Sequence, residues 1–269
     1  MQLSIHHETL YRYSIDQAYS IQQLHLTPRP EGQQQVLSWR IDTPGNCLAY
    51  SDAYGNVSHM LTLNEAHKEV RIVVEGVVST RMLNGGRLDT EDSLSPLVFT
   101  VSTRLTEPTP LLADIAARCL PRPGARVGTA ELMTLAGHIF CAIQYRSGAT
   151  DVFSTAGDAV MLGAGVCQDH AHVFLACCHA HGIPARYVSG YIDPGSSDHA
   201  ASHAWVDAWA EDPGYSGWVS IDVTHNRLMT DSYCRLAIGR DYESAAPVRG
   251  MRRGGGHEVM SVKALIVPV

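Results

Sequence analysis

A cysteine at the start of a predicted helix is the residue of this sequence best placed for covalent chemistry. Cys167 follows the glycine-rich segment 163–166 and opens a stretch that Gly182 and Pro184 end in the order typical of a helix C-terminus. In the first turn of a helix, unpaired backbone N–H groups and the positive end of the dipole favour a thiolate. Cys167 is therefore a candidate nucleophile, although a small buried cysteine would show the same pattern.

A histidine and an aspartate downstream lie on a predicted hairpin that supplies the partners such a cysteine needs. The turn sequence at 211–214 separates two predicted strands, 204–209 and 217–222. A turn centred between Asp212 and Pro213 gives partners an index sum of 212 + 213 = 425, which is also 203 + 222. This register predicts that His203 faces Asp222. A carboxylate that holds one imidazole nitrogen leaves the other to accept a thiol proton, as a Cys-His-Asp triad requires.

The elements around these residues predict an α+β fold in two units. Residues 1–90 show strand signals at 3–15, 21–27, 36–41, 57–63 and 69–79 without a convincing helix, which indicates an N-terminal antiparallel β domain. Residues 91–269 begin with helical periodicity at 111–119 and 130–143. They continue with the cysteine helix, the strands 185–192, 204–209 and 217–222, and a closing strand at 259–267.

Charge and composition limit the classes of function. The chain has 20 Lys and Arg against 27 Asp and Glu, a net charge of −7, which argues against binding nucleic acid or an anionic membrane. No apolar run reaches the roughly 18–20 residues that cross a bilayer, and the opening residues lack a signal-peptide pattern. The seven cysteines are scattered without a C-x-x-C pair. We therefore expect a cytoplasmic protein with reduced thiols, no membrane association and an oligomeric state that the sequence leaves open.

Four segments and the N-terminal region together resemble a known family. The segments are GAGVCQDHAH at 163–172, GIPARYVSGY at 182–191, HAWVDAW at 203–209 and GWVSIDVTHN at 217–226. They resemble the bacterial transglutaminase-like family, whose members are often described as cysteine proteases. The Leu-x-Leu-x-Pro-Arg segment at 24–29 is similar to the N-terminal region that accompanies this core, so the resemblance covers essentially the whole chain.

The resemblance implies a papain-like core with defined roles. Cys167 matches the family nucleophile, His203 the general base and Asp222 the orienting acid. The sequence departs from the family at Val223, where a proline is usual, and at His170, where an aromatic residue is common. Neither departure touches the triad, so they bear on the pocket and the substrate.

Other residues near the cysteine are candidates for supporting roles. The backbone N–H of Cys167 is the first choice for an oxyanion donor, and the second donor is not identified. Gln168 and Asp169 lie in the first helical turn, where Asp169 suits a capping role. We expect His172 to be a buried structural histidine, and Tyr145 either supports the site from upstream or packs in the core.

His170 and Trp205 are the candidates for a substrate groove. Trp205 belongs to an aromatic set on the hairpin that either lines the groove or covers the core.

A metal site and a cofactor are not expected. Four of the 14 histidines, His170, His172, His179 and His181, lie on the cysteine helix, but they form no H-E-x-x-H or comparable ligand set. His170 and His172 point about 200° apart on a helix with 3.6 residues per turn.

The sequence thus predicts acyl transfer on amide or peptide bonds through a thioester, with a peptide or protein as substrate. Hydrolysis, as in a cysteine peptidase or amidase, is the preferred outcome. A transglutaminase that uses an amine acceptor employs the same triad. A third hypothesis is a peptide-binding scaffold that keeps the fold without catalysis, although it offers no reason to retain all three triad residue types.

Overall fold

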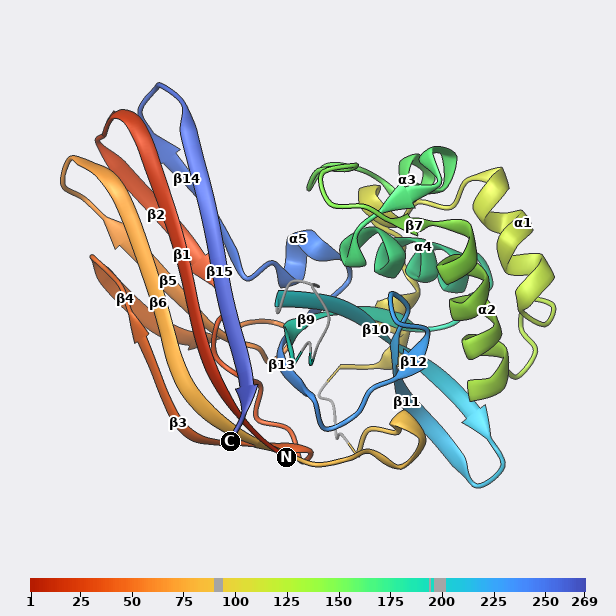
Figure 1. Cartoon of the computed structure of the whole chain (residues 1–269). Coiled ribbons are helices and arrows are strands. Elements are labelled where there is room, and N and C mark those ends of the chain that lie inside the picture. The colour runs from red at the N-terminus through yellow and green to blue at the C-terminus, as the bar shows by residue number, and fades with distance from the viewer. Residues whose placement is uncertain (90–93, 194, 196–201) are drawn as a thin grey trace.

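Two units lie side by side in the computed structural model, which describes residues 1–89, 94–193, 195 and 202–269 (Figure 1). One is a sandwich of two β-sheets and the other is a core of helices packed on a sheet, so the predicted α+β fold class is confirmed. The predicted boundary at residues 90 and 91 lies outside the described residues. Among the described residues, no helix is both long and apolar enough to cross a bilayer.

The sandwich is built from the strands that the N-terminal sequence predicted. Its sheets have the orders β15-β1-β6-β3 and β14-β2-β5-β4. Along β1, Leu3, Ile5, Tyr11 and Tyr13 are buried, as the two-residue period requires. Among the N-terminal strands, β4 was not predicted, because its side chains are mostly exposed and show no apolar alternation. The N-terminal strands are β1 (Gln2–Gln17), β2 (Tyr19–Leu24), β3 (Gln34–Asp42), β4 (Asn46–Ser51), β5 (Val57–Leu63) and β6 (His67–Thr80).

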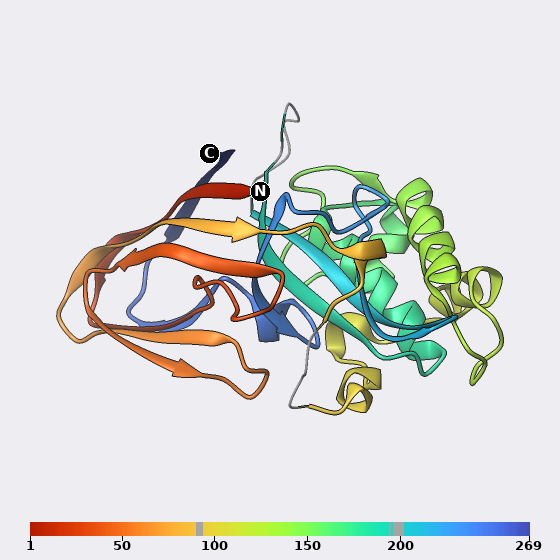
Figure 2. The ribbon, with the colours of Figure 1, turned by 90° about the horizontal axis from the view of Figure 1, so that it is seen from below.

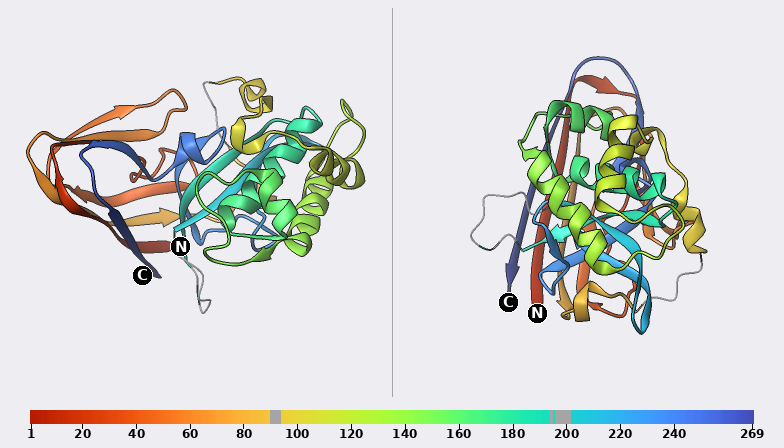
Figure 3. Two further views of the ribbon diagram at one scale, coloured as in Figure 1. Left: turned by 90° about the horizontal axis from the view of Figure 1, so that it is seen from above. Right: turned by 90° about the vertical axis from the view of Figure 1, so that its right-hand side faces the viewer.

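The C-terminal residues return to the sandwich. β14 (Val248–Arg253) pairs with β2, and β15 (Glu258–Pro268) pairs with β1 along most of that strand. The prediction that residues 91–269 form one unit therefore needs correction at its C-terminal end. These pairings join residues more than two hundred positions apart, and the strand pattern at 259–267 does not show which sheet would receive it. Figures 2 and 3 show the blue C-terminal strands beside the red N-terminal ones.

The core places helices on one face of an antiparallel sheet with the order β12-β11-β10-β9-β13 (Figure 3). The central helix α4 (Cys167–Ala180) is buried at almost every position, and the other helices pack around it. The remaining helices are α1 (Pro110–Cys119), α2 (Thr129–Ala142), α3 (Ala156–Leu162) and α5 (Tyr242–Ala245), with short 3₁₀ turns at Asn84–Gly86, Pro96–Thr100 and Arg104–Thr106. The strands are β7 (Gln144–Tyr145), β8 (Ala164–Gly165), β9 (Ala185–Ile192), β10 (Ser202–Asp212), β11 (Tyr215–Asp222), β12 (Arg227–Leu228) and β13 (Tyr233–Gly239).

The β10–β11 hairpin differs from the predicted register by two residues. Val206 pairs with Ile221, so the index sum is 206 + 221 = 427 and the loop consists of Pro213 and Gly214 alone. Gly214 has a φ of 77°, which suits glycine at the third position of a tight turn. A shift of two residues keeps every side chain on its face of the sheet. His203 and Asp222 therefore remain on one face, as diagonal neighbours.

A buried network of charges joins the sandwich to the core sheet. Glu31, in the loop after β2, accepts hydrogen bonds from Arg29 Nε at 2.8 Å and from Arg235 Nε on β13 at 2.6 Å. Arg235 also donates to both carboxylate oxygens of Asp207 on β10, at 2.9 and 2.7 Å, and Arg186 Nε donates to Asp207 at 2.8 Å. Burial raises the pKa of Asp207, but the two arginines outweigh it and hold that pKa below its usual range.

We expect Glu31→Ala to lower the free energy of unfolding by about 3–5 kcal/mol, because it removes the carboxylate that pairs with the buried Arg29 and one of the two that pair with the buried Arg235. Glu69→Ala is the matched control. It breaks the exposed pair with Arg12, where the contribution is about 0–1 kcal/mol. Urea unfolding followed by circular dichroism compares the two variants, and equal midpoints would contradict a stabilising role for the buried network.

Candidate active site

Cys167 is the first residue of α4, and the side chain of Asp169, two residues later, holds the neighbouring backbone in place. Asp169 Oδ2 accepts hydrogen bonds from the backbone N–H of Val166 at 2.7 Å and from Thr150 Oγ1 at 2.6 Å. A Cβ at Gly165 would lie 2.6 Å from Asp169 Oδ2, so only glycine permits this close approach. Asp169 is thus the N3 residue of a capping box at the start of α4, in which its side chain accepts the N–H of the N-cap residue Val166, and burial raises the pKa of its carboxyl.

The structure brings the three predicted triad residues together. Nε2 of His203 donates a hydrogen bond to Oδ2 of Asp222 at 2.8 Å. The Cys167 side chain acts on His203 and raises the pKa of its ring, and Nδ1 is the ring nitrogen that Asp222 leaves open to the thiol. His203 is 6% exposed and Asp222 is fully buried, whereas Cys167 keeps partial exposure. The thiol is therefore the member of the set that a substrate can reach.

Two further residues hold the Asp222 carboxylate, and the sequence reasoning missed both. Oδ2 also accepts from Nδ1 of His225 at 2.7 Å and from the hydroxyl of Tyr233 at 2.6 Å. The His225 backbone N–H donates to Oδ1 at 3.1 Å. His225 lies three residues after Asp222 in the recognised motif, so its spacing was visible. Tyr233 lies on β13, a strand that the sequence did not predict.

The charges of these residues set the protonation of the site. Burial lowers the pKa of His203, but the Asp222 carboxylate and the Cys167 thiol outweigh it and raise that pKa to about 10. Burial likewise raises the pKa of Asp222, and the two histidines overcome it and hold the carboxyl ionised. An imidazolium between a carboxylate and a thiol stabilises the thiolate, which is the nucleophilic form.

The candidate oxyanion donors lie beside the thiol. As the first residue of α4, Cys167 has a backbone N–H with no acceptor inside the helix. Tyr145 pairs with Gly165 across the short parallel β7–β8 ladder, and burial and the charge of Cys167 raise its pKa. The side-chain Nε2 of Gln168 is buried and has no hydrogen-bond partner among the residues that the structure describes. The arrangement brings Tyr145 near the thiol and leaves Gln168 as an unused donor.

The predicted groove residues do not line a surface. His170 is 1% exposed and both ring nitrogens are engaged, with Thr224 Oγ1 at 3.0 Å and the Ile143 carbonyl at 3.1 Å. Trp205 is fully buried and donates its Nε1–H to Ser220 Oγ at 3.0 Å. The assignment of His170 and Trp205 to a substrate groove is therefore corrected. Because helices or strands cover every face of α4, its polar side chains point into the interior.

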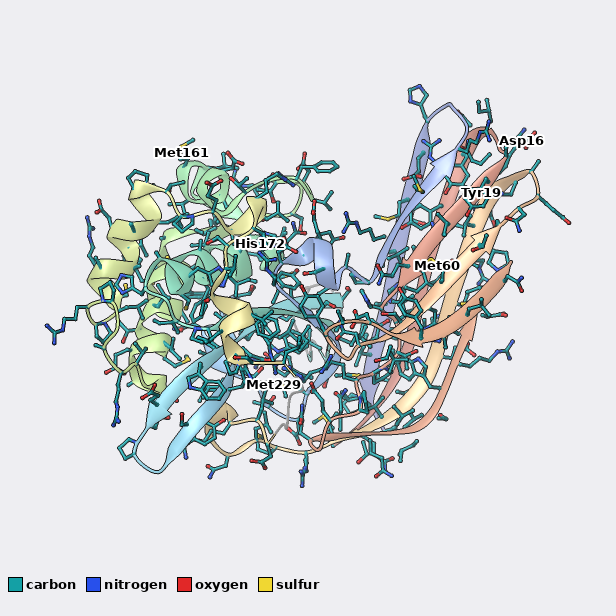
Figure 4. All side chains as sticks on the ribbon, turned by 180° about the vertical axis from the view of Figure 1, so that it is seen from behind. Asp16, Tyr19, Met60, Met161, His172 and Met229 are labelled. Carbon is teal, nitrogen blue, oxygen red and sulfur yellow. The ribbon has the colours of Figure 1, made fainter. Side chains whose placement is uncertain are left out.

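His172 is a structural residue of the core, as expected. Figure 4 shows it inside the helical side of the core, far from Asp16 and Tyr19 at the outer tip of the sandwich. Its Nε2 accepts the backbone N–H of Tyr242 at 3.1 Å, which ties α4 to α5. Burial lowers the pKa of His172 to about 4, so the ring is neutral at pH 7 and can accept that hydrogen bond.

One group of side chains could in principle hold a metal ion. The ligand atoms of His203, Asp222 and His225 all lie within 4.8 Å of one another. Their N···O distances of 2.8 and 2.7 Å are those of hydrogen bonds. Two ligands of one tetrahedral zinc ion, each about 2.0–2.1 Å from the metal, stand about 3.3 Å apart. The observed spacing therefore fits shared protons better than a shared metal.

The comparisons with known proteins identify the family. The bacterial transglutaminase-like N-terminal region matches residues 3–79, and the transglutaminase-like superfamily core matches residues 123–223. An uncharacterised protein of Mycobacterium tuberculosis (strain ATCC 25618 / H37Rv) is 30% identical over 290 residues, which span 97% of this chain and 91% of that protein. The chain therefore belongs to the bacterial transglutaminase-like family, which confirms the resemblance seen in its sequence.

Two further relatives carry descriptions of activity. The crystal structure titled a "putative cysteine protease" from Cytophaga hutchinsonii matches with a TM-score of 0.76 and 22% identity, over 100% of this chain and 91% of that one, which shows a shared fold. A protein-glutamine gamma-glutamyltransferase of Pseudomonas aeruginosa PAO1 is 30% identical over 104 residues, 34% of this chain and 15% of that protein.

We expect iodoacetamide to label Cys167 faster than Cys141, which is the exposed thiol, by about tenfold at pH 6. At that pH a free thiol is hardly ionised, whereas the imidazolium of His203 still stabilises a thiolate. Because the raised pKa of His203 is about 10, the imidazolium is fully present below neutral pH and is lost as the pH rises through that value. The rate of Cys167 labelling should therefore stay high from about pH 6 to 9.

Mass spectrometry of peptides from the partly labelled protein measures these rates site by site. Asp222→Asn should abolish the advantage of Cys167, because the charge that raises the pKa of His203 is gone. The thiols of Cys177 and Cys178 serve as internal negative controls, since burial raises the pKa of both. Equal rates at Cys167 and Cys141 would contradict an activated thiol.

Proposed function

We propose that the protein is a thiol-dependent acyl transferase that attacks amide or peptide bonds and passes the acyl group to water. The observation that carries the proposal is the chain of contacts from Asp222 through His203 to Cys167, in which the carboxylate raises the pKa of the imidazole. Membership of the transglutaminase-like superfamily supports the same class of reaction.

The geometry supports the following sequence of steps. The Cys167 thiolate attacks the amide carbon, and the backbone N–H of Cys167 donates to the developing oxyanion. His203 then gives its proton to the leaving amine, and a thioester forms as the C–N bond breaks. In the second half, His203 takes a proton from water, which attacks the thioester and releases a carboxylic acid and the thiolate. Asp222 holds Nε2 throughout, so Nδ1 always faces the reaction.

Water and an amine compete for the same thioester. The resemblance to a Pseudomonas protein-glutamine gamma-glutamyltransferase over 104 residues favours transfer to an amine. Hydrolysis, in contrast, needs no second substrate site. We therefore keep hydrolysis as the main proposal and amine transfer as the alternative. A peptide or protein is the proposed substrate, and the cytoplasmic location stays a prediction.

A peptide library should leave an acyl adduct on Cys167 that intact-protein mass spectrometry detects. Adding a primary amine should change little if water is the acceptor, and should yield amide-linked products if transfer dominates. Cys167→Ala should give neither adduct nor turnover. Asp222→Asn should slow turnover by about four orders of magnitude, as the equivalent change does in a serine-protease triad, because the imidazole loses its orientation and counter-charge.

The double variant Cys167→Ala, Asp222→Asn is the control for this assignment. Residues that act as one unit are not additive, so the double variant should be no slower than Cys167→Ala alone. A Cys167→Ala protein that keeps measurable turnover would contradict the covalent mechanism. A wild-type protein that binds peptides without any adduct would instead favour the scaffold hypothesis.

A further inference from the structure

A groove runs between the sandwich and the catalytic core. It has a volume of about 590 Å³. β1, β2, β14 and β15 form its sandwich side, and α5 with the loop at 152–153 forms its core side. Figures 1 and 3 show β14 and β15 on the side of the sandwich nearest α5. The proposed mechanism uses only residues of the core, and it gives this groove no role.

The sandwich presents the edge of a strand to the groove. Five consecutive residues of β14, 248–252, line it, so the groove follows the strand's edge and not one of its faces. β14 is the last strand of its sheet. The carbonyls of Pro247 and Arg253 accept hydrogen bonds, at 2.9 Å each, from residues that flank β2. In an antiparallel ladder, the backbone groups of successive residues point to opposite sides of the strand. The N–H and C=O groups of Val248, Gly250 and Arg252 therefore point away from β2. Within the described part of the chain, no hydrogen bond reaches these groups.

The side chains of the groove are largely apolar and the charges balance. Met251 is 70% exposed, Met260 is 56% exposed and Phe153 is 68% exposed. Arg252 pairs with Glu258 at 3.1 Å, and Arg249 donates to the Glu243 carbonyl at 2.9 Å with the carboxylate close by. An occupant without net charge and with apolar side chains therefore fits this surface.

Two tyrosines of the sandwich extend the apolar surface of the groove inward. Tyr11 and Tyr13 of β1 point between the two sheets and reach the groove at the open side of the sandwich. A side chain that enters between the sheets would contact these rings. Along an added strand, alternate side chains would point in this direction.

The groove reaches the helix that carries the thiol. Tyr242 lines the groove, and its backbone N–H donates to Nε2 of His172 on α4, the helix that begins at Cys167. The ring of Tyr242 also packs edge-on against that of Tyr187 on β9, with the ring centroids 6.3 Å apart. A chain that lies along β14 therefore leads towards the helix that begins at Cys167.

We propose that an extended, apolar segment of a polypeptide substrate binds in this groove as an additional strand on β14, beside the bond that Cys167 attacks. Strand addition to an open edge gains affinity from main-chain hydrogen bonds and specificity from pockets for alternate side chains, and this groove provides both. The proposal rests on the proposed function and gives the sandwich a role, which is to favour polypeptides over small amides.

The test removes one outward N–H without removing the strand. Val248→Pro deletes a donor at a position of an edge strand where proline is tolerated, and Val248→Ala is the matched control for the lost side chain. Met260→Lys places a charge in the groove. Val259→Lys, on the opposite face of β15 and 66% exposed, is its control outside the groove.

Two measurements separate this proposal from the proposed function. In the Cys167→Ala background, fluorescence anisotropy gives the Kd for labelled β-casein, an unfolded polypeptide. We expect Val248→Pro to raise the Kd at least tenfold more than Val248→Ala does, and Met260→Lys to raise it about tenfold while Val259→Lys has no effect. In the catalytic background, the ratio of kcat/KM for β-casein to that for benzyloxycarbonyl-glutaminylglycine should fall by the same factors.

Each outcome has a distinct meaning. Equal casein affinity in Val248→Pro and Val248→Ala overturns strand addition, as does turnover of the small amide without any binding of casein. A wild-type dimer in light scattering that Val248→Pro converts to a monomer also overturns it, because a second copy would then cover the edge. Edge-dependent binding of casein without any acyl-enzyme would support the groove and contradict the proposed function instead.

Discussion

The negative charge of Asp222 is the constraint on which the site depends. One oxygen of this fully buried carboxylate accepts hydrogen bonds from His203, His225 and Tyr233. A buried carboxylate without such donors would be protonated, because burial disfavours the charged form. The donors keep it ionised, and its charge keeps His203 protonated in a position that burial would otherwise make neutral. The reactivity that we propose for Cys167 rests on this chain of charges.

The fold holds these groups by the simple alternation of strands. On β10, Ala204, Val206 and Ala208 belong to the apolar core shared with the helices, and His203 with Asp207 lies on the opposite face. That face carries both the orienting aspartate and the buried network of arginines. The same sheet therefore positions the candidate triad residues at its end and anchors the sandwich behind them. A polypeptide that lies along the sandwich edge would then lead towards the helix that begins at Cys167.

Local patterns predicted most elements and the three candidate catalytic residues. The strand periodicity of β1 and the end signals of α4 depend on residues close in sequence, and both agree with the structure. The hairpin register was wrong by two, yet His203 and Asp222 still meet because the error preserved the face. Long-range features were not accessible. The pairing of β14 and β15 with the sandwich depends on which strands, far away in the sequence, have an open edge.

Burial was the other quantity that the sequence could not show. His170 and Trp205 have residue types that suit a groove, but their neighbours on adjacent elements enclose them. Tyr233 reaches Asp222 from a strand that carries no clear pattern, so its role appears only in three dimensions. The groove along β14 is formed by segments from both ends of the chain, and no single stretch of sequence indicates it.

The protonation state of His203 tests most directly whether the charge of Asp222 controls the site. Nitrogen-15 NMR of histidine-labelled protein, assigned with a His203→Gln variant, reports whether each imidazole is charged. We predict that His203 remains an imidazolium at neutral pH, loses its proton only as the pH rises towards about 10, and becomes neutral near pH 7 in Asp222→Asn. A neutral His203 ring at pH 7 in the wild-type protein would contradict it.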